Sequence, residues 1–454
     1  LSVPHLKHSS ARRKLFKPRQ TLNIIMNSLL KRGLEKLECH FTWDLGQYQN
    51  ELQGMKREMD LDVPQKISSP VHYYNLLGFI QKSLGSDREA LESLQKAESV
   101  IQEQGTEETA VRLLVNKANM AWVHFHLGEL EKSRGYLEEL EELQRIHPAP
   151  PGCPLHPEVS GEKGWTLVKF NKSKKRLAID YFKMALEAEP ERKEWHKGLA
   201  ISMSKACLWY KCTPEQKAEI LEKVKTAAEI NPNDLLLQAL YLVKLSYVTK
   251  VNVEREMRDL LERCLEIVNV PGLNIILKYL GDISFDESIR EGERFQERYP
   301  ESIKVLKCLA DTYKWKVYKM NEDTEERVIL ARKTIELLEK VCGYNPDSHR
   351  AKVALAAMHY YAHNTERADE IYQQLLLEEE LSPDKWQYIY YCYASYLNQC
   401  KRFSESVQFH IKGVKTPGDS VDKEKSLNIL KKIVWRGKDP LCSEIRQLLK
   451  TTQK

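Results

Sequence analysis

The residues of this chain that could do chemistry are mainly cations that could hold an anion. Lysines and arginines gather in two stretches, residues 169–176 and 423–438, while acidic residues gather elsewhere, at 138–142 and 378–380. The cations are Lys169, Lys172, Lys174, Lys175 and Arg176 in the first stretch and Lys423, Lys425, Lys431, Lys432, Arg436 and Lys438 in the second. Either cluster taken singly is best explained as a solvated helix face. Two clusters inside one concave surface would favour a polyanionic partner.

Residue patterns typical of catalysis or metal binding are missing from the sequence. It contains no glycine-rich phosphate loop, no H-E-x-x-H and no G-x-S-x-G. The ten cysteines form no C-x-x-C pair, and neither Cys207 with Cys212 nor Cys153 with His156 has a second pair at metal-ligand spacing. We therefore expect reduced thiols, no metal, no cofactor and no enzymatic activity.

A recurring spacing of small residues indicates the elements that must position the cations. A small residue precedes a second small residue by 12 positions at several places: Gly78 and Ala90, Ala121 and Ser133, Thr166 and Ala178, Ala356 and Ala368. This is the tetratricopeptide signature, in which two antiparallel helices touch where their side chains are small. Since one helix pair cannot bury its apolar face alone, the pairs stack into a superhelix. The sequence predicts an all-α tetratricopeptide-repeat superhelix, an α-solenoid with several lobes around a central basic channel.

Proline and charge divide the chain into four expected segments. We interpret residues 1–26 as a disordered basic extension, or as an artefact of gene prediction with Met26 as the true start. Residues 27–146 are expected to form an N-terminal repeat lobe, 147–158 a Pro-rich linker or loop, and 159–454 the central and C-terminal repeat lobes with a terminal basic helix. No stretch approaches 18 uninterrupted apolar residues, so no membrane span is expected, and the absence of a signal peptide favours the cytoplasm.

Several strings resemble the interferon-induced proteins with tetratricopeptide repeats, the IFIT family. The most specific are LECHFTW at residues 37–43 and EKGWTLVKF at 162–170. YNLL at 74–77, AWV at 121–123 and LNILKK at 427–432 follow in the family's order. The resemblance implies an interferon-inducible cytoplasmic antiviral protein of innate immunity. Some members of the family bind single-stranded RNA with an unmodified 5′ end in a deep positive channel. Others act by pairing with relatives or with signalling and translation proteins.

The resemblance also implies particular site residues. The family's phosphate-contacting lysine, in the helix that contains Gly164 and Trp165, falls on Lys169, its pocket tyrosine on Lys175 and its pocket arginine on Lys205. Candidates for the rest of the RNA channel are Lys278, Lys307, Tyr393, Lys425, Lys432 and Arg436. Converging lysines suit phosphates as point charges, and an aromatic side chain suits a stacked base.

Two functions remain open from the sequence. The first is an antiviral protein that binds single-stranded RNA, with a 5′-phosphorylated or uncapped end, to block the use of viral RNA. The second is an adaptor that holds related tetratricopeptide proteins, as a homo- or hetero-oligomer, or signalling and translation factors. The first is favoured if Lys169, Lys205, Lys307 and Lys432 converge in a closed channel, and the second if they point apart.

Overall fold

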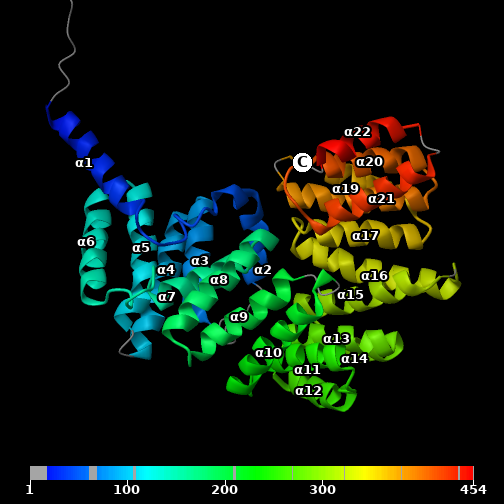
Figure 1. Cartoon of the computed structure of the whole chain (residues 1–454), viewed down its shortest axis with the longest axis horizontal. Coiled ribbons are helices and arrows are strands. Elements are labelled where there is room, and N and C mark those ends of the chain that lie inside the picture. The colour runs from blue at the N-terminus through cyan, green and yellow to red at the C-terminus, as the bar shows by residue number, and fades with distance from the viewer. Residues whose placement is uncertain are drawn as a thin grey trace, which may run out of the picture.

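The computed structural model shows a succession of stacked helices that follows a curved path from the N-terminal helices round to α22 (Figure 1). It describes residues 18–60, 69–105, 109–207, 211–267, 269–321, 323–379, 381–437 and 440–452. Within these ranges every regular element is a helix, which confirms the predicted all-α class. None of the described helices is long and apolar enough to cross a membrane.

The N-terminal segment consists of α1 (Pro18–Leu34), a short 3₁₀ helix η1 (Gly46–Glu51) and α2 (Leu52–Asp60). Residues 18–26 were expected to be disordered, and this is wrong, because α1 already begins at Pro18. Residues 1–17 of that expected segment lie outside the described residues. The loop with the LECHFTW string is tightly packed: buried His40 lies 3.3 Å from Asn119 on one side and 2.9 Å from Thr166 on the other.

Antiparallel helix pairs follow one another along the rest of the chain. The pairs are α3 (Pro70–Ser83) with α4 (Asp87–Gln104), α5 (Thr109–His126) with α6 (Leu130–Ile146), α7 (Pro157–Leu167) with α8 (Lys172–Ala188), α9 (Lys193–Ala206) with α10 (Pro214–Ile230), α11 (Leu235–Thr249) with α12 (Glu254–Ile267), α13 (Val270–Ile283) with α14 (Phe285–Arg298), α15 (Ile303–Lys319) with α16 (Glu325–Tyr344), α17 (His349–Tyr361) with α18 (Thr365–Leu376), α19 (Pro383–Gln399) with α20 (Phe403–Lys415), and α21 (Val421–Arg436) with α22 (Cys442–Thr452). This succession confirms the tetratricopeptide superhelix.

The small residues of the signature lie where the helices of a pair touch. A Cβ added at Gly78 on α3 would come within 2.7 Å of Leu94 on α4, so a larger residue has no room there. In the next pair, the Ser133 hydroxyl donates a hydrogen bond of 2.9 Å to the Ala121 carbonyl. The 12-residue spacing therefore marks the contact between helices, as expected.

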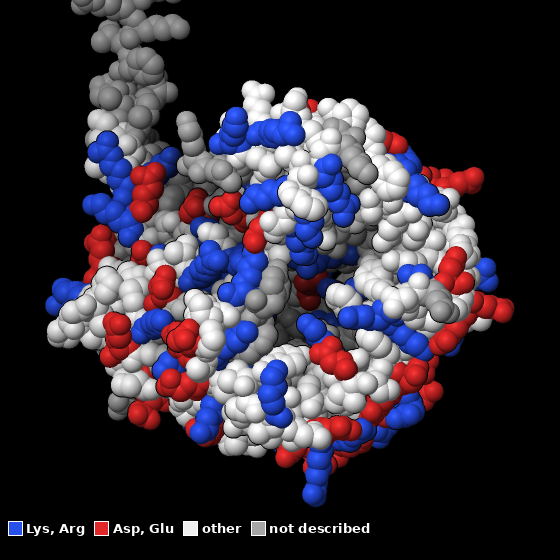
Figure 2. Space-filling view, turned by 45° about the vertical axis from the view of Figure 1, so that its right-hand side comes forward, with Lys and Arg blue, Asp and Glu red and all other residues white. Residues whose placement is uncertain are grey.

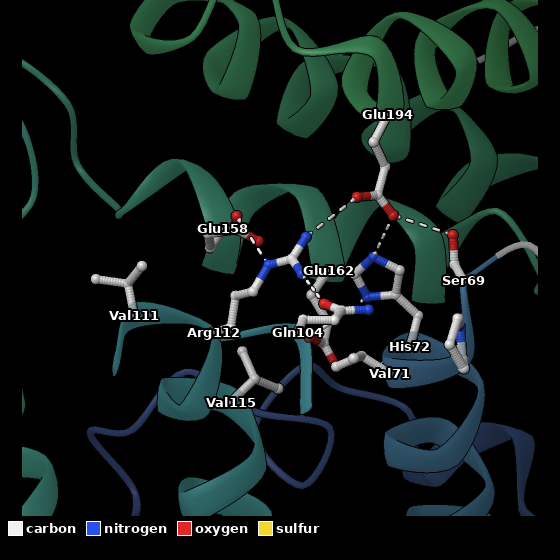
Figure 3. Close-up of a pocket in the computed structure, with 11 residues that line it drawn as sticks. Ser69, Val71, His72, Gln104, Val111, Arg112, Val115, Glu158, Glu162 and Glu194 are labelled. Carbon is white, nitrogen blue, oxygen red and sulfur yellow. Dashed lines mark hydrogen bonds and ion pairs between the residues drawn. The ribbon is translucent and has the colours of Figure 1, made fainter. Parts of the chain in front are cut away.

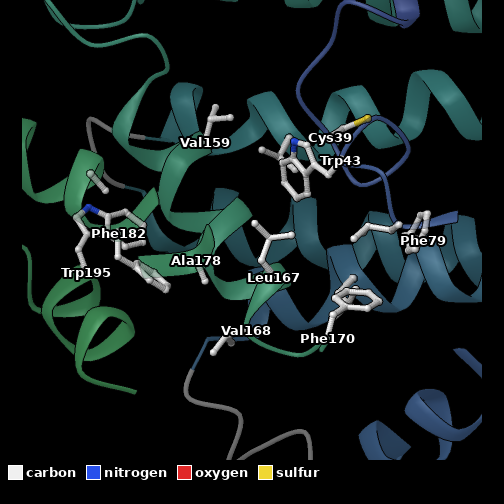
Figure 4. Close-up of a cluster of buried hydrophobic side chains, with 14 of the residues drawn as sticks. Cys39, Trp43, Phe79, Val159, Leu167, Val168, Phe170, Ala178, Phe182 and Trp195 are labelled. Atoms are coloured by element: carbon white, nitrogen blue, oxygen red, sulfur yellow. The ribbon is translucent and has the colours of Figure 1, made fainter. Parts of the chain in front are cut away.

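The core continues across the proline-rich segment. A single cluster of buried apolar side chains runs from Leu30 to Leu237, and Figure 4 shows its part around Trp43, Phe182 and Trp195. Residues 147–156 lie between α6 and α7. Because α7 packs against α3 and α5 on the far side of this loop, the segment joins two repeats within one core and does not separate two lobes. Further clusters continue the core towards the C-terminus.

Candidate nucleic-acid interface

Ion pairs between the two ends of the superhelix close it around a hollow. Arg57 on α2 contacts Asp347, which precedes α17, with 2.7 Å between Nη1 and Oδ2. Two further pairs connect the N-terminal segment to later repeats, Glu58 with Lys307 at 3.1 Å and Glu51 with Lys385 at 3.8 Å. Another pair joins Lys211, which precedes α10, to Glu424 on α21. Figure 2 shows the hollow at the centre of one face, with lysines, arginines and a few carboxylates around it. A hollow with basic side chains around it is therefore present where the sequence predicted a channel.

Three of the predicted phosphate-binding lysines come together in the fold. Lys169 lies in the turn after α7, and not in the helix where the sequence placed it; Lys175 is in the first turn of α8, and Lys205 is near the end of α9. Desolvation and the positive charges of Lys169 and Lys175 lower the pKa of Lys205 to about 8. The effect of one charge on another falls with distance, so Lys169 and Lys175 lie in the neighbourhood of Lys205.

The lysine cluster lies in a concave place. Solvent reaches the side chain of Lys169, yet desolvation by the protein atoms around it lowers its pKa. A group that is both accessible and surrounded by protein lies in a cleft. The N-terminus of α8 adds positive potential there, because its first turn carries no acidic residue. Cations held together without full compensation favour an incoming polyanion.

Not every lysine of the first basic stretch is available for a ligand. Lys174 is buried and donates to Asp44 at 3.1 Å, so it holds α8 against the loop before η1. Lys172 instead lies near Arg176 and Lys211. Desolvation, and then the positive charges of these two residues, lower the pKa of Lys172. The stretch thus divides into structural and accessible members.

The predicted cations of the central repeats lie on other parts of the wall. Lys307 is exposed on α15 and forms the ion pair with Glu58. Lys278 is exposed on α13. Desolvation is the main cause that lowers the pKa of Lys244 on α11 to about 8, and the positive charge of Lys278 contributes to this shift. Glu58 also acts on Lys169, so Lys307 belongs to the same neighbourhood as the lysine cluster. No contact within the described residues connects Lys278 to that cluster.

Tyr393 was expected to stack a base in the channel, and this is wrong. It is 1% exposed and packs against Tyr372 and Phe409, with ring centroids 4.8 and 4.7 Å away. Its hydroxyl accepts a hydrogen bond of 3.0 Å from Gln373. The physical reason is helical spacing: Ile389, Tyr393 and Leu397 are four apart on the face of α19 that enters the core.

A different aromatic residue of α19 faces the cations. Tyr388 is half-buried, and the guanidinium of Arg350 lies 5.3 Å from the centre of its ring. Desolvation is the main cause that lowers the pKa of Lys175, and the positive charge of Arg350 is the next. Arg350 therefore lies between Tyr388 and the lysine cluster, although these three residues come from α17, α19 and α8. The sequence offered no local signal for this arrangement, because each residue lies in a different repeat.

The basic helix α21 places one cation, Lys425, beside an aromatic residue of α19. Lys425 lies 4.9 Å from the ring centre of Tyr391 and contacts Asp422 at 3.0 Å. Leu430 is fully buried against the preceding repeat, as expected. Lys432 and Arg436 are exposed further along the helix. No contact among the described residues brings Lys432 or Arg436 to the lysine cluster, so they stay candidates for the RNA backbone only.

A second cavity, of about 90 Å³, is lined by buried charges where α3, α5, α7 and α9 meet (Figure 3). His72 lies 3.4 Å from Glu162 and 3.1 Å from Glu194. Desolvation opposes the charged imidazole, but the hydrogen bonds to both carboxylates raise the pKa of His72 to about 10. Arg112 contacts Glu158 and Glu194 from the other side. These groups neutralise one another, so we interpret the network as a joint between repeats.

The superhelical fold and the basic residues around its hollow define the class of this protein: a tetratricopeptide-repeat protein with a cationic channel. No protein-family profile matches the chain. It is 27% identical to the human antiviral innate immune response effector IFIT1 over 90% of this chain and 88% of that protein. It is 29% identical to human interferon-induced protein with tetratricopeptide repeats 2 over 89% of this chain and 87% of that protein.

Solved structures agree with the sequence similarity. A structure of a human IFIT1 dimer with PPP-AAAA superimposes with a TM-score of 0.67 at 26% identity, covering 93% of this chain and 94% of that chain. A human IFIT1 dimer with m7Gppp-AAAA gives a TM-score of 0.66, covering 93% and 95%. The chain is therefore similar to IFIT proteins along about nine tenths of its length, as the LECHFTW and EKGWTLVKF strings indicated.

Proposed function

We propose that this protein is an interferon-inducible antiviral effector that binds single-stranded RNA in its cationic channel. The observation that carries the proposal is the proximity of Lys169, Lys175 and Lys205, because desolvation, together with the positive charges of the other two lysines, lowers the pKa of Lys205 to about 8. Such a cluster is costly without a ligand and becomes favourable when phosphates enter. The relatives solved with PPP-AAAA and m7Gppp-AAAA support an RNA with a phosphorylated 5′ end as the ligand.

The channel divides the work between phosphate and base contacts. The lysine cluster and Arg350 hold the 5′ phosphates, while Tyr388 offers a ring for a following base. Lys307 and Lys425 add backbone contacts on the C-terminal side. The protein acts by sequestering RNA in the cytoplasm and not by catalysis. Because a relative was solved as a dimer, we also propose assembly with a second copy or a related tetratricopeptide protein.

Salt dependence of RNA binding tests this function. A filter-binding series with a 5′-triphosphate single-stranded RNA should show log K falling with log salt at about 0.7 per phosphate contact, because lysine–phosphate contacts release counterions. Lys169→Glu, Lys175→Glu and Lys205→Glu combined should abolish most of the binding. The matched control is Lys96→Glu, which changes an exposed lysine on α4. No binding by the folded parent protein, together with capture of a related tetratricopeptide protein, would favour the adaptor function instead.

A further inference from the structure

Glu58 is one of several carboxylates whose charges act on the cations of the channel; Glu51 and Asp384 act on Lys175. Glu58, on α2, lies 3.1 Å from Lys307 on α15, and its negative charge also acts on Lys169 and Lys304. Lys169 follows α7, whereas Lys304 and Lys307 lie on α15, so Glu58 acts on two parts of the superhelix that are far apart in the sequence. A phosphate entering beside Lys169 therefore meets the negative charge of Glu58.

Glu58 is accessible to such a ligand. Its side chain is 57% exposed and that of Lys307 is 50% exposed, so the pair lies on the wall of the hollow and not in the core. An exposed pair of this kind adds little to folding stability, since its two charges remain hydrated. Its effect on an anionic ligand is larger, because a like charge at short range repels each further phosphate group.

We propose that Glu58 is a specificity-determining residue that narrows the preference of the channel for 5′-triphosphate over 5′-hydroxyl RNA. The inference rests on the proposed function and adds its selectivity. Glu58 occupies Lys307 and offsets part of the positive potential at Lys169. A triphosphate, which brings several negative charges to this place, is penalised more than an RNA that brings only its backbone.

Two variants and two RNAs of identical sequence test the role of Glu58. Glu58→Gln removes the charge at nearly constant shape. We expect it to bind 5′-triphosphate RNA about tenfold more tightly than the parent, and 5′-hydroxyl RNA no more than about twofold more tightly. Tripolyphosphate should also compete better for the variant. The matched control is Glu141→Gln on α6, an exposed carboxylate of the acidic stretch, which should leave both affinities unchanged.

Lys307→Gln distinguishes two possible causes of tighter RNA binding by Glu58→Gln: the loss of a negative charge and the loss of the ion pair between α2 and α15. Both variants break the Glu58–Lys307 pair, but only Glu58→Gln makes the channel more positive. If the gain came from opening the ring, Lys307→Gln would bind more tightly as well; we expect it to bind more weakly. Equal gains for both RNAs, or no gain, would overturn the role of Glu58 while leaving the proposed function intact. Absence of RNA binding by parent and Glu58→Gln alike would contradict the proposed function itself, and the inference with it.

Discussion

Lys205 shows how neighbouring charges make a single residue sensitive to pH. Desolvation and the charges of Lys169 and Lys175 lower its pKa to about 8, so it is protonated at pH 7 and mostly neutral at pH 9. Bound phosphate would stabilise the ammonium form and raise this pKa, so RNA binding takes up a proton between the two values. The phosphate groups themselves are already ionised in this range.

RNA affinity should therefore fall as pH rises through 8, by up to about tenfold per pH unit for this group. Lys205→Arg should reduce the dependence, because a guanidinium stays charged. Desolvation also lowers the pKa values of Lys169 and Lys175, so a shallower slope remains. The measurement is filter binding at constant ionic strength from pH 7 to 9, with Lys96→Arg as the control. A slope in Lys205→Arg equal to that of the parent would remove Lys205 from the phosphate site.

At the scale of the element, α19 has two aromatic faces with different roles. Tyr393 enters the core beside Tyr372 and Phe409, while Tyr388 meets Arg350. The two residues are five apart, which turns them to different sides of the helix. One helix therefore stabilises the repeat stack with one face and lines the channel with the other.

Alanine substitutions on α19 should separate these roles. Tyr393→Ala should lower the free energy of unfolding by about 3–5 kcal/mol, because it leaves a cavity in the core. Tyr388→Ala should cost less stability than Tyr393→Ala, because Tyr388 only partly packs against the core, but it should weaken RNA binding by about 1–3 kcal/mol, the range for loss of one stacked base. Thermal unfolding and filter binding measure the two effects. If Tyr388→Ala bound RNA like the parent, the ring would be a packing partner of Arg350 only.

At the scale of the whole molecule, the channel exists because the superhelix closes. Arg57 with Asp347 and Lys385 with Glu51 join segments about 290 and 330 residues apart in the chain. The side chains of both pairs are only partly exposed, and each pair contributes little, about 1 kcal/mol, but both pairs act on the relative position of the same two segments. Reversing several of them should therefore open the ring without unfolding the repeats.

Arg57→Glu combined with Lys385→Glu should increase the radius of gyration measured by X-ray scattering, because both pairs become repulsive. Adding Asp347→Arg and Glu51→Lys should restore the compact state, since the charges are then exchanged. Circular dichroism should show unchanged helix content in both proteins. Scattering curves that do not differ would mean that apolar contacts, and not these ion pairs, hold the ends together.

The sequence by itself determined the repeat architecture of this protein, its cationic character and its kinship. The small-residue spacing is local, since Gly78 and Leu94, or Ala121 and Ser133, meet within one helix pair. Helix contacts of this kind depend on neighbours along the chain, so a pattern of residue types predicts them. The expected phosphate lysines were found together for the same reason: adjacent repeats carry Lys169, Lys175 and Lys205.

Only the tertiary structure decided what faces these lysines. Glu58, Arg350 and Tyr388 reach the channel because the superhelix curves until α2 meets α15 and α17. That curvature is the sum of small rotations between many repeats, and no local pattern encodes it. The error at Tyr393 has the same origin, since an aromatic residue on a repeat helix can serve the core or the channel. Which of the two it serves depends on how the helix is turned in the assembled ring.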